Sequence, residues 1–342
     1  MRASGITVIN GRARLSSRSS VQVSGVEYRF EDLAVAAGAT PVELGIPGSD
    51  RMTTSEQFLD IDELPDSVIF IGGGYVSFEL AWLARRAGSE VTIVHRSTDV
   101  LRAFDPDLTS ALLAHYESQG IRIVTDAPAI EIRENRDLLE VVTPGAVFEA
   151  KMVVHGAGRA AAVSKLELER ADVAYGPQGI KVSRQLRSIT NPKVWAAGDV
   201  ADLGEPLTPV ASHQGSIVAD NILGADRDFD PPPVPTVVFS DPPLASVGVT
   251  VREARSNASH SVVESDMGSW FTQARIGNSI ALARVIEDRE SGAILGAHLL
   301  GIGADEFINL FALAIGTGAT VQQVEAILWA YPTVASDIKY IV

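Results

Sequence analysis

The order of apolar and polar positions in the first half of the chain predicts strands and helices in alternation. Short β-branched runs are followed by segments in which apolar residues recur with a helical period, and glycines close these segments. The predicted elements are, in order, strand Val68–Ile71, helix Tyr75–Ala87, strand Glu90–Val94, a helix that starts at Asp105-Pro106, and strand Ile121–Val124. Such an alternation predicts a doubly wound α/β domain around a parallel sheet.

The flanking segments have other patterns. Short β-like runs precede the α/β segment, at Ile6–Ile9, Val21–Val23 and Leu33–Ala37. A second strand-then-turn unit at Val194–Asp199 leads into a helix over about 210–223. The proline-rich stretch 228–235 predicts a linker, and the β runs and apolar helix after it predict an α+β tail.

Charge and composition exclude several classes of function. The 342-residue chain has 28 basic and 43 acidic residues, a formal net charge of −15, which disfavours nucleic acids and acidic membranes as partners. It has no cysteine, so thiol chemistry and thiolate sites in this chain are excluded, and we assign no metal ligands. The longest uncharged stretch, 307–324, contains glycine, asparagine and glutamine and predicts a buried helix and a turn rather than a membrane span. We expect a cytoplasmic location.

A glycine run lies where a strand gives way to a helix. Gly72, Gly73 and Gly74 follow the first predicted strand, the context that a dinucleotide-binding fingerprint requires. Gly72 permits the tight turn, Gly74 lets backbone N–H groups approach a pyrophosphate at the helix start, and the small Ser77 allows close helix–strand packing. The alternative is that these glycines only turn the chain.

The end of the next strand favours NADPH over NADH. NAD-binding domains place an acid about 20 residues after the loop, to bind the ribose hydroxyls. Here the strand ends in His95 and Arg96, and Arg102 follows six residues later. Guanidinium groups suit the additional 2′-phosphate of NADPH. The alternative is two surface arginines on a solvated loop.

Several motifs together resemble the flavin-dependent pyridine nucleotide-disulfide oxidoreductases, whose members include glutathione reductase, mercuric reductase, dihydrolipoamide dehydrogenase and the soluble transhydrogenase. The similarity runs from about Gly5 to Val342. The matching segments are the NAD(P)H loop Ile71–Ala81, the strand end Ala36–Pro41, the flavin strand Asn191–Ala201, the segment Leu207–Ala211 behind the flavin ring, and the opening of the dimerisation domain, Val237–Gly248.

The resemblance implies a role for each matching residue. Tyr75 corresponds to the residue that lies over the flavin until nicotinamide displaces it, and Glu79 to the acid near the nicotinamide carboxamide. Asp199 corresponds to the carboxylate that binds the ribityl chain, and Thr208 to a backbone contact to the ring. The implied NADPH-binding residues are Gly72, Gly73, Gly74, Tyr75, Glu79, His95, Arg96, Arg102 and Gly158. The implied FAD-binding residues are Gly38, Gly198, Asp199 and Thr208. Without the resemblance, Tyr75 and Glu79 are also compatible with ordinary helix positions, and Asp199 with a cap.

The sequence departs from the family pattern at two places. The amino-terminal βαβ unit, with the FAD pyrophosphate loop and the redox cysteines, is not recognisable. Tyr331 occupies the position of the family's catalytic histidine, and Ser336 lies near that of its glutamate. A tyrosine, with a pKa near 10, does not replace an imidazole at neutral pH. A misplaced start, a second polypeptide carrying the missing half, and a true fragment all account for the first departure, and we expect the misplaced start.

Together these observations predict a Rossmann-type doubly wound NAD(P)H domain inserted in a partial FAD domain and followed by an α+β dimerisation domain. The expected boundaries are 1–50 and 161–230 for the FAD segments, 51–160 for the NAD(P)H domain and 231–342 for the dimerisation domain.

The expected function is NADPH-dependent, FAD-linked oxidoreduction resembling that of glutathione reductase, in which hydride passes from NADPH to flavin and on to an unidentified small-molecule acceptor. The protein is expected to be a homodimer through its carboxy-terminal domain, with Tyr75, Glu79 and Tyr331 as candidate catalytic residues. The alternatives are a soluble transhydrogenase-like enzyme and a catalytically inactive NADPH-binding dimeric fragment.

Overall fold

The computed structural model describes residues 5–342 and separates into two compact units. The first unit is built from residues 5–42 and 159–231, and the second from residues 43–158 and 232–342. None of the helices formed by residues 5–342 is both long enough and apolar enough to cross a membrane.

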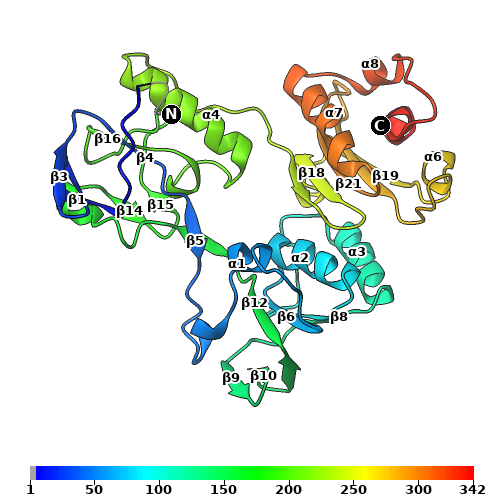
Figure 1. Ribbon diagram of the computed structural model, residues 1–342. Helices are drawn as coiled ribbons and strands as arrows, with labels where there is room; N and C mark the ends of the chain where they lie inside the picture. Colours follow the sequence, from blue (N-terminus) through cyan, green and yellow to red (C-terminus); the bar gives the residue numbers. More distant parts are fainter. Residues whose placement is uncertain (1–4) are drawn as a thin grey trace. The chain divides into compact units, whose positions relative to one another are not determined.

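The second unit contains the predicted parallel sheet. Its strands are, in spatial order, β12 (Met152–His155), β6 (Ser67–Ile71), β7 (Glu90–Val94) and β8 (Ile121–Val124), and all neighbouring pairs run parallel. Helices α2 (Tyr75–Arg86) and α3 (Pro106–Ser118) connect successive strands and lie on one side of the sheet (Figure 1). The sequence prediction of a doubly wound α/β domain is confirmed.

The two faces of this sheet are buried by different layers. Because side chains alternate across a strand, Val68 and Phe70 point to the cluster that contains the helices, whereas Ile69 and Ile71 belong to a second cluster. That second cluster is completed by an antiparallel meander, which the sequence analysis did not predict. The meander strands are β9 (Glu131–Asn135), β10 (Leu138–Val142) and β11 (Val147–Ala150).

Local signals set the ends of the two helices. Asp105 caps α3, because its Oδ1 accepts hydrogen bonds from the backbone N–H groups of Asp107 and Leu108, each at 3.1 Å. Helix α2 ends before Gly88, whose φ of 106° lies in the left-handed region that glycine adopts without strain. The start of α3 lies where the sequence pattern predicts it, and α2 ends one residue before its predicted end.

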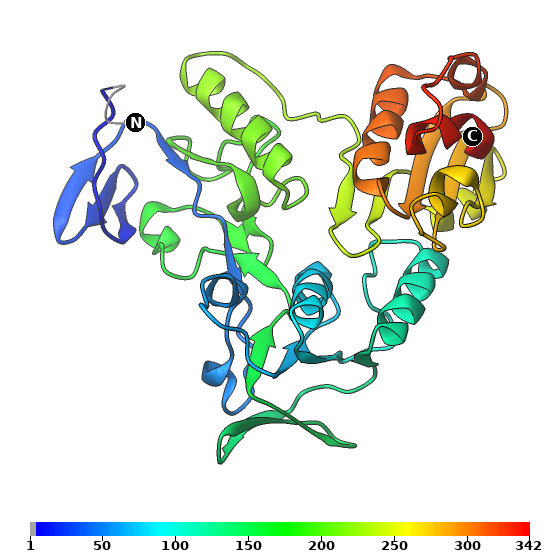
Figure 2. The same ribbon diagram turned by 45° about the vertical axis from the view of Figure 1, so that its right-hand side comes forward.

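A five-stranded antiparallel sheet completes the second unit. Its spatial order is β17 (Thr236–Val238), β18 (Leu244–Gly248), β21 (Ile294–Leu300), β20 (Leu282–Asp288) and β19 (His260–Asp266). Helix α7 (Ala304–Thr317), drawn in orange in Figure 2, packs on β18 and β21. The shorter helices of this unit are α1 (Ser55–Leu59), α5 (Val251–Arg255), α6 (Phe271–Ala274), α8 (Val321–Glu325) and α9 (Ile338–Ile341).

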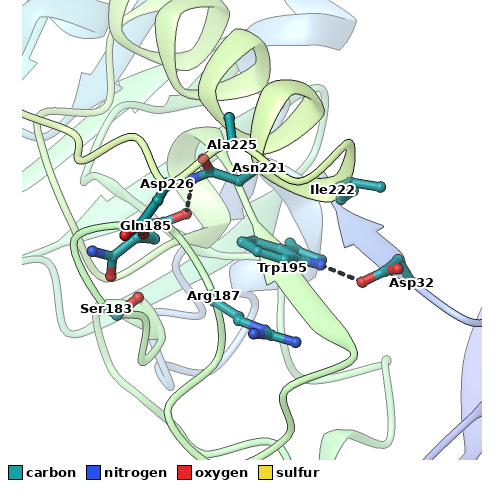
Figure 3. Close-up of a pocket in the computed structure, with 9 residues that line it drawn as sticks. All are labelled: Asp32, Ser183, Gln185, Arg187, Trp195, Asn221, Ile222, Ala225 and Asp226. Carbon is teal, nitrogen blue, oxygen red and sulfur yellow. Dashed lines mark hydrogen bonds between the residues drawn. The ribbon is translucent and has the colours of Figure 1, made fainter.

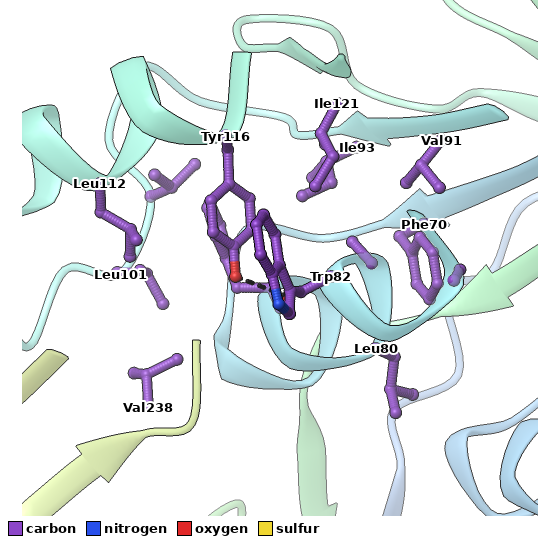
Figure 4. Packing of buried hydrophobic residues seen from close by; sticks show 14 of the residues in the cluster. Phe70, Leu80, Trp82, Val91, Ile93, Leu101, Leu112, Tyr116, Ile121 and Val238 are labelled. Carbon is purple, nitrogen blue, oxygen red and sulfur yellow. Dashed lines mark hydrogen bonds between the residues drawn. The ribbon is translucent and has the colours of Figure 1, made fainter. Parts of the chain in front are cut away.

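One hydrophobic cluster joins the parallel sheet to the antiparallel one. Trp82 of α2 stacks on Tyr116 of α3, with ring centroids 5.3 Å apart, and Val238 of β17 belongs to the same cluster (Figure 4). The Tyr116 hydroxyl donates to the Phe78 carbonyl oxygen at 3.1 Å, which satisfies the polar end of this buried side chain. The packing in this cluster therefore holds α2, the helix that follows the glycine loop, against α3 and β17.

The first unit contains small sheets and one long helix. Strands β1 (Ala13–Ser17), β2 (Ser20–Val23) and β3 (Val26–Arg29) form an antiparallel sheet, and β4 (Leu33–Val35) pairs in parallel with β16 (Val194–Ala196). The pairs β5 (Ala39–Pro41) with β13 (Arg159–Ala161), and β14 (Tyr175–Gly176) with β15 (Gly179–Ile180), are antiparallel. Helix α4 (Thr208–Ile222) follows β16, as predicted.

The predicted strand at Ile6–Ile9 is wrong. These residues form no ladder with any described strand, and Ile6 and Ile9 are 53% and 45% exposed. An apolar run forms a strand only where a partner strand and a buried face are available.

Candidate functional site

The glycine run forms a tight turn between β6 and α2. Gly72 has φ 125°, and a Cβ placed on it would lie 2.1 Å from the Gly156 carbonyl oxygen. A Cβ on Gly73 would lie within 2.7–2.9 Å of Val100 and His95. Both positions therefore exclude a side chain for reasons of folding, whereas a Cβ on Gly74 would have no neighbour nearer than 3.9 Å.

The start of α2 is open to an anion. Gly74 is its N-cap residue and has no side chain to cap the helix. Its first-turn N–H groups and the positive end of the helix dipole suit a pyrophosphate. Ser77 of the first turns is fully buried, and its Oγ would lie 2.0 Å from a Cβ on Gly156, so helix and sheet approach as closely as the fingerprint requires.

The second predicted cofactor segment follows β7 and lies beside this loop. His95 packs under Gly73, and its Nε2 lies 2.9 Å from Ser97 Oγ and 3.1 Å from the Asp99 carbonyl oxygen. Arg102 Nη2 donates to Ser97 Oγ at 2.6 Å. The backbone N–H of Leu101 donates to the Gly73 carbonyl oxygen at 2.8 Å, so the arginine segment is tied directly to the glycine loop.

No carboxylate in the described part of the chain neutralises the two arginines. Arg96 and Arg102 are exposed and form no ion pair with residues 5–342. The nearby carboxylate of Asp126 instead accepts from Thr98 Oγ1, at 3.0 and 3.3 Å. Two guanidinium groups therefore remain available at the strand end.

Tyr75 and Glu79 lie one turn apart on α2. Tyr75 is 50% exposed. Glu79 is half-buried, and its Oε1 accepts from the backbone N–H of Phe239 at 2.9 Å, 160 residues further along the chain. Burial raises the pKa of Glu79, and the Phe239 hydrogen bond partly offsets this rise.

Two further features adjoin this site in the second unit. Gly158, with φ 115°, lies two residues beyond Gly156, the residue against which Gly72 packs. Arg102 also lines a cavity of about 160 Å³ between the loop before α3 and the antiparallel sheet. The other residues of this cavity are Ala103, Phe104, Asp105, Pro106, Thr250, Val251, Arg252 and His298.

The predicted FAD residues all belong to the first unit. Gly38 (φ 68°) accepts at its carbonyl oxygen from the Ala162 N–H at 2.9 Å. Gly198 (φ 72°) follows β16, and its N–H donates to the buried Gln214 Oε1 at 2.7 Å. Asp199 is half-buried in the same turn, and Thr208 is exposed as the first residue of α4, whose start no described side chain caps. The turn after β16 is thus linked through Gln214 to the second turn of α4.

A cavity of about 340 Å³ lies elsewhere in the first unit (Figure 3). Its wall includes Trp195, whose Nε1 donates to Asp32 at 2.8 Å and whose ring lies under the Arg187 guanidinium. None of the predicted FAD residues lines it. The lining residues are Asp32, Ser183, Gln185, Arg187, Trp195, Asn221, Ile222, Ala225 and Asp226.

Tyr331 lies on the surface of the second unit. It is 71% exposed and stacks on Phe271, with ring centroids 6.2 Å apart. Asp337 is buried and accepts a hydrogen bond from the Thr272 hydroxyl, and burial raises its pKa. No carboxylate in the described part of the chain is hydrogen-bonded to the Tyr331 hydroxyl, unlike the histidine–glutamate pair that the family pattern implies.

Sequence reasoning did not identify Ser97 or Phe239. Ser97 contacts both His95 and Arg102, and its place directly after Arg96 was the only available signal. Phe239 contacts Glu79 through its backbone, so its side-chain type carried no signal at all.

Comparisons with known proteins agree with the motifs. The family model described as pyridine nucleotide-disulphide oxidoreductase matches residues 1–215, and the model of that family's dimerisation domain matches residues 234–341. A glutathione reductase of Burkholderia cepacia is 32% identical over 339 residues, 97% of this chain and 74% of that protein. A mercuric reductase of Staphylococcus aureus is 29% identical over 346 residues, 98% of this chain and 62% of that protein.

A third relative and a solved structure extend this agreement. A dihydrolipoyl dehydrogenase of Bacillus subtilis is 30% identical over 345 residues, 96% of this chain and 72% of that protein. The solved structure of the HOCl-induced flavoprotein disulfide reductase RclA from Escherichia coli superimposes with a TM-score of 0.91 at 26% identity, and covers 98% of this chain and 78% of that one. The chain spans 62% to 74% of the length of the three relatives. The chain belongs to the pyridine nucleotide-disulphide oxidoreductase family.

Proposed function

We propose that the protein is an NADPH-dependent, FAD-linked oxidoreductase that passes hydride from NADPH to flavin and on to a small-molecule acceptor. The observation that carries this proposal is that the α2 start, where the N-cap residue is a glycine, lies beside Arg96 and Arg102, which form no ion pair with residues 5–342. The first element suits a pyrophosphate and the second an additional phosphate on the ribose.

The choice of NADPH over NADH rests on charge. A carboxylate at the strand end would bind the two ribose hydroxyls of NADH and repel a 2′-phosphate. In this chain His95 and Arg96 occupy that position, and Asp126 is engaged by Thr98. Each charge-assisted hydrogen bond to the phosphate contributes about 1.5–3 kcal/mol.

The residues that we assign to FAD all lie in the first unit. Gly198 and Asp199 turn directly after β16. The first turn of α4 packs against Gly198, because a Cβ on Gly198 would lie 3.2 Å from Ala211 Cβ, and the N-cap residue of α4, Leu207, makes no side-chain capping bond. This arrangement suits a polar ligand whose ring carries carbonyl groups. We assign Asp199 to the ribityl hydroxyls, Thr208 to the ring, and Gly38 and Gly198 to close backbone approach. When bound, flavin would accept hydride from the nicotinamide and deliver electrons to the acceptor.

Two residues of α2 would act on the nicotinamide. Tyr75, half exposed at the first helical position, would cover the ring site until the nicotinamide displaces it. Glu79 uses one carboxylate oxygen for Phe239, and its other oxygen would accept from the carboxamide. Gly158, which follows β12, would contribute backbone to the wall of the nicotinamide site.

A transhydrogenase-like reaction is the second candidate. Tyr331 stands where disulfide reductases carry histidine, and in this structure it stacks on Phe271 without a carboxylate partner among residues 5–342. A phenol does not supply the acid–base function of that histidine at neutral pH. Hydride exchange between NADPH and an NAD analogue would support this candidate, and its absence would remove it.

We also propose that the protein is a homodimer through residues 231–342. The match of residues 234–341 to the family's dimerisation domain supports this proposal. Leu313, Leu328 and Tyr340 of this region are 63%, 100% and 61% exposed and are candidates for the interface.

The test of cofactor choice is isothermal titration calorimetry with NADPH and NADH. We expect Arg96→Glu combined with Arg102→Ala to weaken NADPH binding on the order of 100-fold, since two charge-assisted bonds are lost, and to leave NADH binding within about threefold. Arg86→Ala, an exposed arginine at the other end of α2, is the matched control. Equal weakening of both nucleotides would show that the arginines do not read the 2′-phosphate.

Flavin retention is tested by the visible spectrum of the purified protein. A yellow protein that NADPH bleaches supports the oxidoreductase, whereas a colourless protein that binds NADPH favours an inactive NADPH-binding dimeric fragment.

A further inference from the structure

The cavity of about 340 Å³ in the first unit contains none of the residues that we assign to FAD or NADPH (Figure 3). Asp32 of its wall directly precedes β4, whereas Gly38, which we assign to FAD, follows that strand. Asn221 and Ile222 of its wall lie in the last turn of α4, and Thr208 is the first residue of that helix. At 1.5 Å per residue, the two ends of α4 lie about 20 Å apart. The cavity is therefore separate from the residues assigned to FAD.

A buried asparagine holds the walls of the cavity in place. Asn221 is 7% exposed, and its Nδ2 donates to the carbonyl oxygens of Gln185 at 3.1 Å and Arg227 at 2.9 Å. Its Oδ1 accepts from the Arg227 N–H at 2.8 Å. Asn221 thus joins the end of α4 to two loops. Because these contacts form among residues of this chain, the cavity exists before any ligand binds, as is usual for small-molecule sites.

Trp195 is the buried aromatic side chain of the cavity. It is 5% exposed, and its Nε1 donates to Asp32 Oδ1 at 2.8 Å. The Arg187 guanidinium carbon lies 5.0 Å from the centroid of its ring, a cation–π contact. Arg187 Nε in turn donates to the Pro192 carbonyl oxygen, whereas its two Nη groups have no hydrogen-bond partner among residues 5–342. The ring and the Pro192 carbonyl therefore hold a guanidinium group whose outer donors are available.

The cavity contains opposite charges that do not pair with each other. Asp226 also lines it, and neither Asp32 nor Asp226 forms an ion pair with Arg187 or with any other described residue. A simple cation bound here would leave the guanidinium unmatched, and a simple anion would meet two carboxylates in a chain whose net charge is −15. A ligand that carries both charges satisfies both kinds of group.

The apolar part of the wall limits what else the ligand carries. Ile222, which is 37% exposed, and the exposed Ala225 lie at the end of α4 and just beyond it. Their methyl groups suit a short aliphatic side chain, whose burial against them is favourable. The volume of about 340 Å³ lies near the lower end of the range for small-molecule sites, so the ligand is small.

We propose that this cavity binds a free amino acid with a short aliphatic side chain. Its carboxylate would accept from the Nη groups of Arg187, and its ammonium would donate to Asp226 and to Asp32 Oδ2, the oxygen that Trp195 does not engage. This site is additional to the proposed oxidoreductase function and does not depend on it.

The test is calorimetric titration of the full chain with L-valine and with two compounds that each lack one of its charges. Isovalerate lacks the ammonium group, and isobutylamine lacks the carboxylate. We expect L-valine to bind in the millimolar range or more tightly. Each of the other compounds should bind at least about fivefold more weakly, because it loses the ionic hydrogen bonds at one end.

Two variants locate the ligand in the cavity. Asp226→Asn removes an exposed carboxylate that has no hydrogen-bond partner among the described residues, so the fold is unaffected. It should weaken L-valine about fivefold and leave isovalerate within about twofold. Arg187→Lys keeps the positive charge but removes the forked donor, and should weaken L-valine and isovalerate alike. Asp62→Asn, the same change at an exposed position of the second unit, is the matched control and should bind L-valine like wild type. Unfolding midpoints measured in parallel report any damage to the fold.

The outcomes decide the proposal in either direction. It is supported if L-valine binds more tightly than both single-charge compounds and Asp226→Asn removes most of that difference. It is overturned if L-valine does not bind, if isovalerate or isobutylamine binds as tightly, or if Asp226→Asn binds L-valine like wild type. NADPH titrations of the same preparations test the proposed function separately, because none of the residues assigned to NADPH lines this cavity.

Discussion

Replacing Gly74 by alanine should separate folding from dinucleotide binding. Gly74 has φ −97° and ψ 177°, an extended conformation open to any residue, and a Cβ there would meet only the Gly156 carbonyl oxygen at 3.9 Å. Alanine at such a position usually stabilises a protein by about 0.4–1 kcal/mol, because the unfolded chain loses freedom. The free energy of unfolding of Gly74→Ala should therefore equal or exceed that of wild type.

The same methyl group would stand where a pyrophosphate approaches the loop. A backbone N–H donates to a phosphate oxygen at about 2.9 Å, whereas a methyl carbon needs about 3.5 Å or more. The loss of one such charge-assisted bond costs about 1.5–3 kcal/mol. We therefore expect NADPH to bind Gly74→Ala about 10- to 100-fold more weakly, with NADH affected to the same degree because both share the pyrophosphate.

The matched control is Gly72→Ala, two residues away. Gly72 has φ 125°, and its added Cβ would lie 2.1 Å from the Gly156 carbonyl oxygen, so backbone must move. We expect this variant to lose about 3 kcal/mol or more of folding free energy. Urea unfolding measures stability and calorimetry measures binding. The reasoning is refuted if Gly74→Ala binds NADPH like wild type, or if it unfolds as easily as Gly72→Ala.

Three further substitutions test the surroundings of the site. Asp105→Ala should destabilise the protein by about 1–2 kcal/mol in urea unfolding, because two hydrogen bonds at the start of α3 are lost, and Asp105→Ser should restore most of this. Ser77→Ala should leave stability unchanged or raise it by up to about 2 kcal/mol, since the Ser77 hydroxyl is buried without a partner among the described residues; a clear loss would reveal a bond that this structure lacks. The raised pKa of Asp337 means that the folded state holds this proton more tightly, so its contribution to stability falls as pH rises above the ordinary value of 3.8. Asp337→Asn, which can still accept from Thr272, should therefore gain stability relative to wild type between pH 4 and pH 7, and a constant difference across that range would contradict the assignment.

The elements around the glycine loop could be predicted because their signals are local. The bounds of β7 and β8 match the predicted strands residue for residue, and α2 ends one residue before the predicted end. Asp105 and Pro106, which are adjacent in the sequence, mark the start of α3. In each case the conformation of a segment is determined by the residues of that segment, so its bounds can be predicted from the local sequence.

The meander β9–β11 was missed because its stability is not local. Its central strand buries Glu140, a charged residue that the pattern indicates as exposed, and this carboxylate is held by Arg133 and Asn135 of the neighbouring strand. The wrong strand at Ile6–Ile9 is the converse case, an apolar run without a partner strand in the described structure. Strand formation depends on pairing and on a face to cover, and neither is visible in a short window.

The cofactor site combines both kinds of information, and this determines which of its residues could be found. The arginines were identified from position and charge, because a strand end after a glycine loop is the place where the ribose is read and the sign of the charge there is a property of the sequence. The contact that ties the arginine segment to the glycine loop could not be predicted, because it joins two backbone groups, the Leu101 N–H and the Gly73 carbonyl oxygen, at 2.8 Å. Because backbone groups carry no residue identity, no sequence pattern encodes that contact. The position of the two guanidinium groups relative to the glycine loop therefore depends on the path of the loop backbone as well as on residue type.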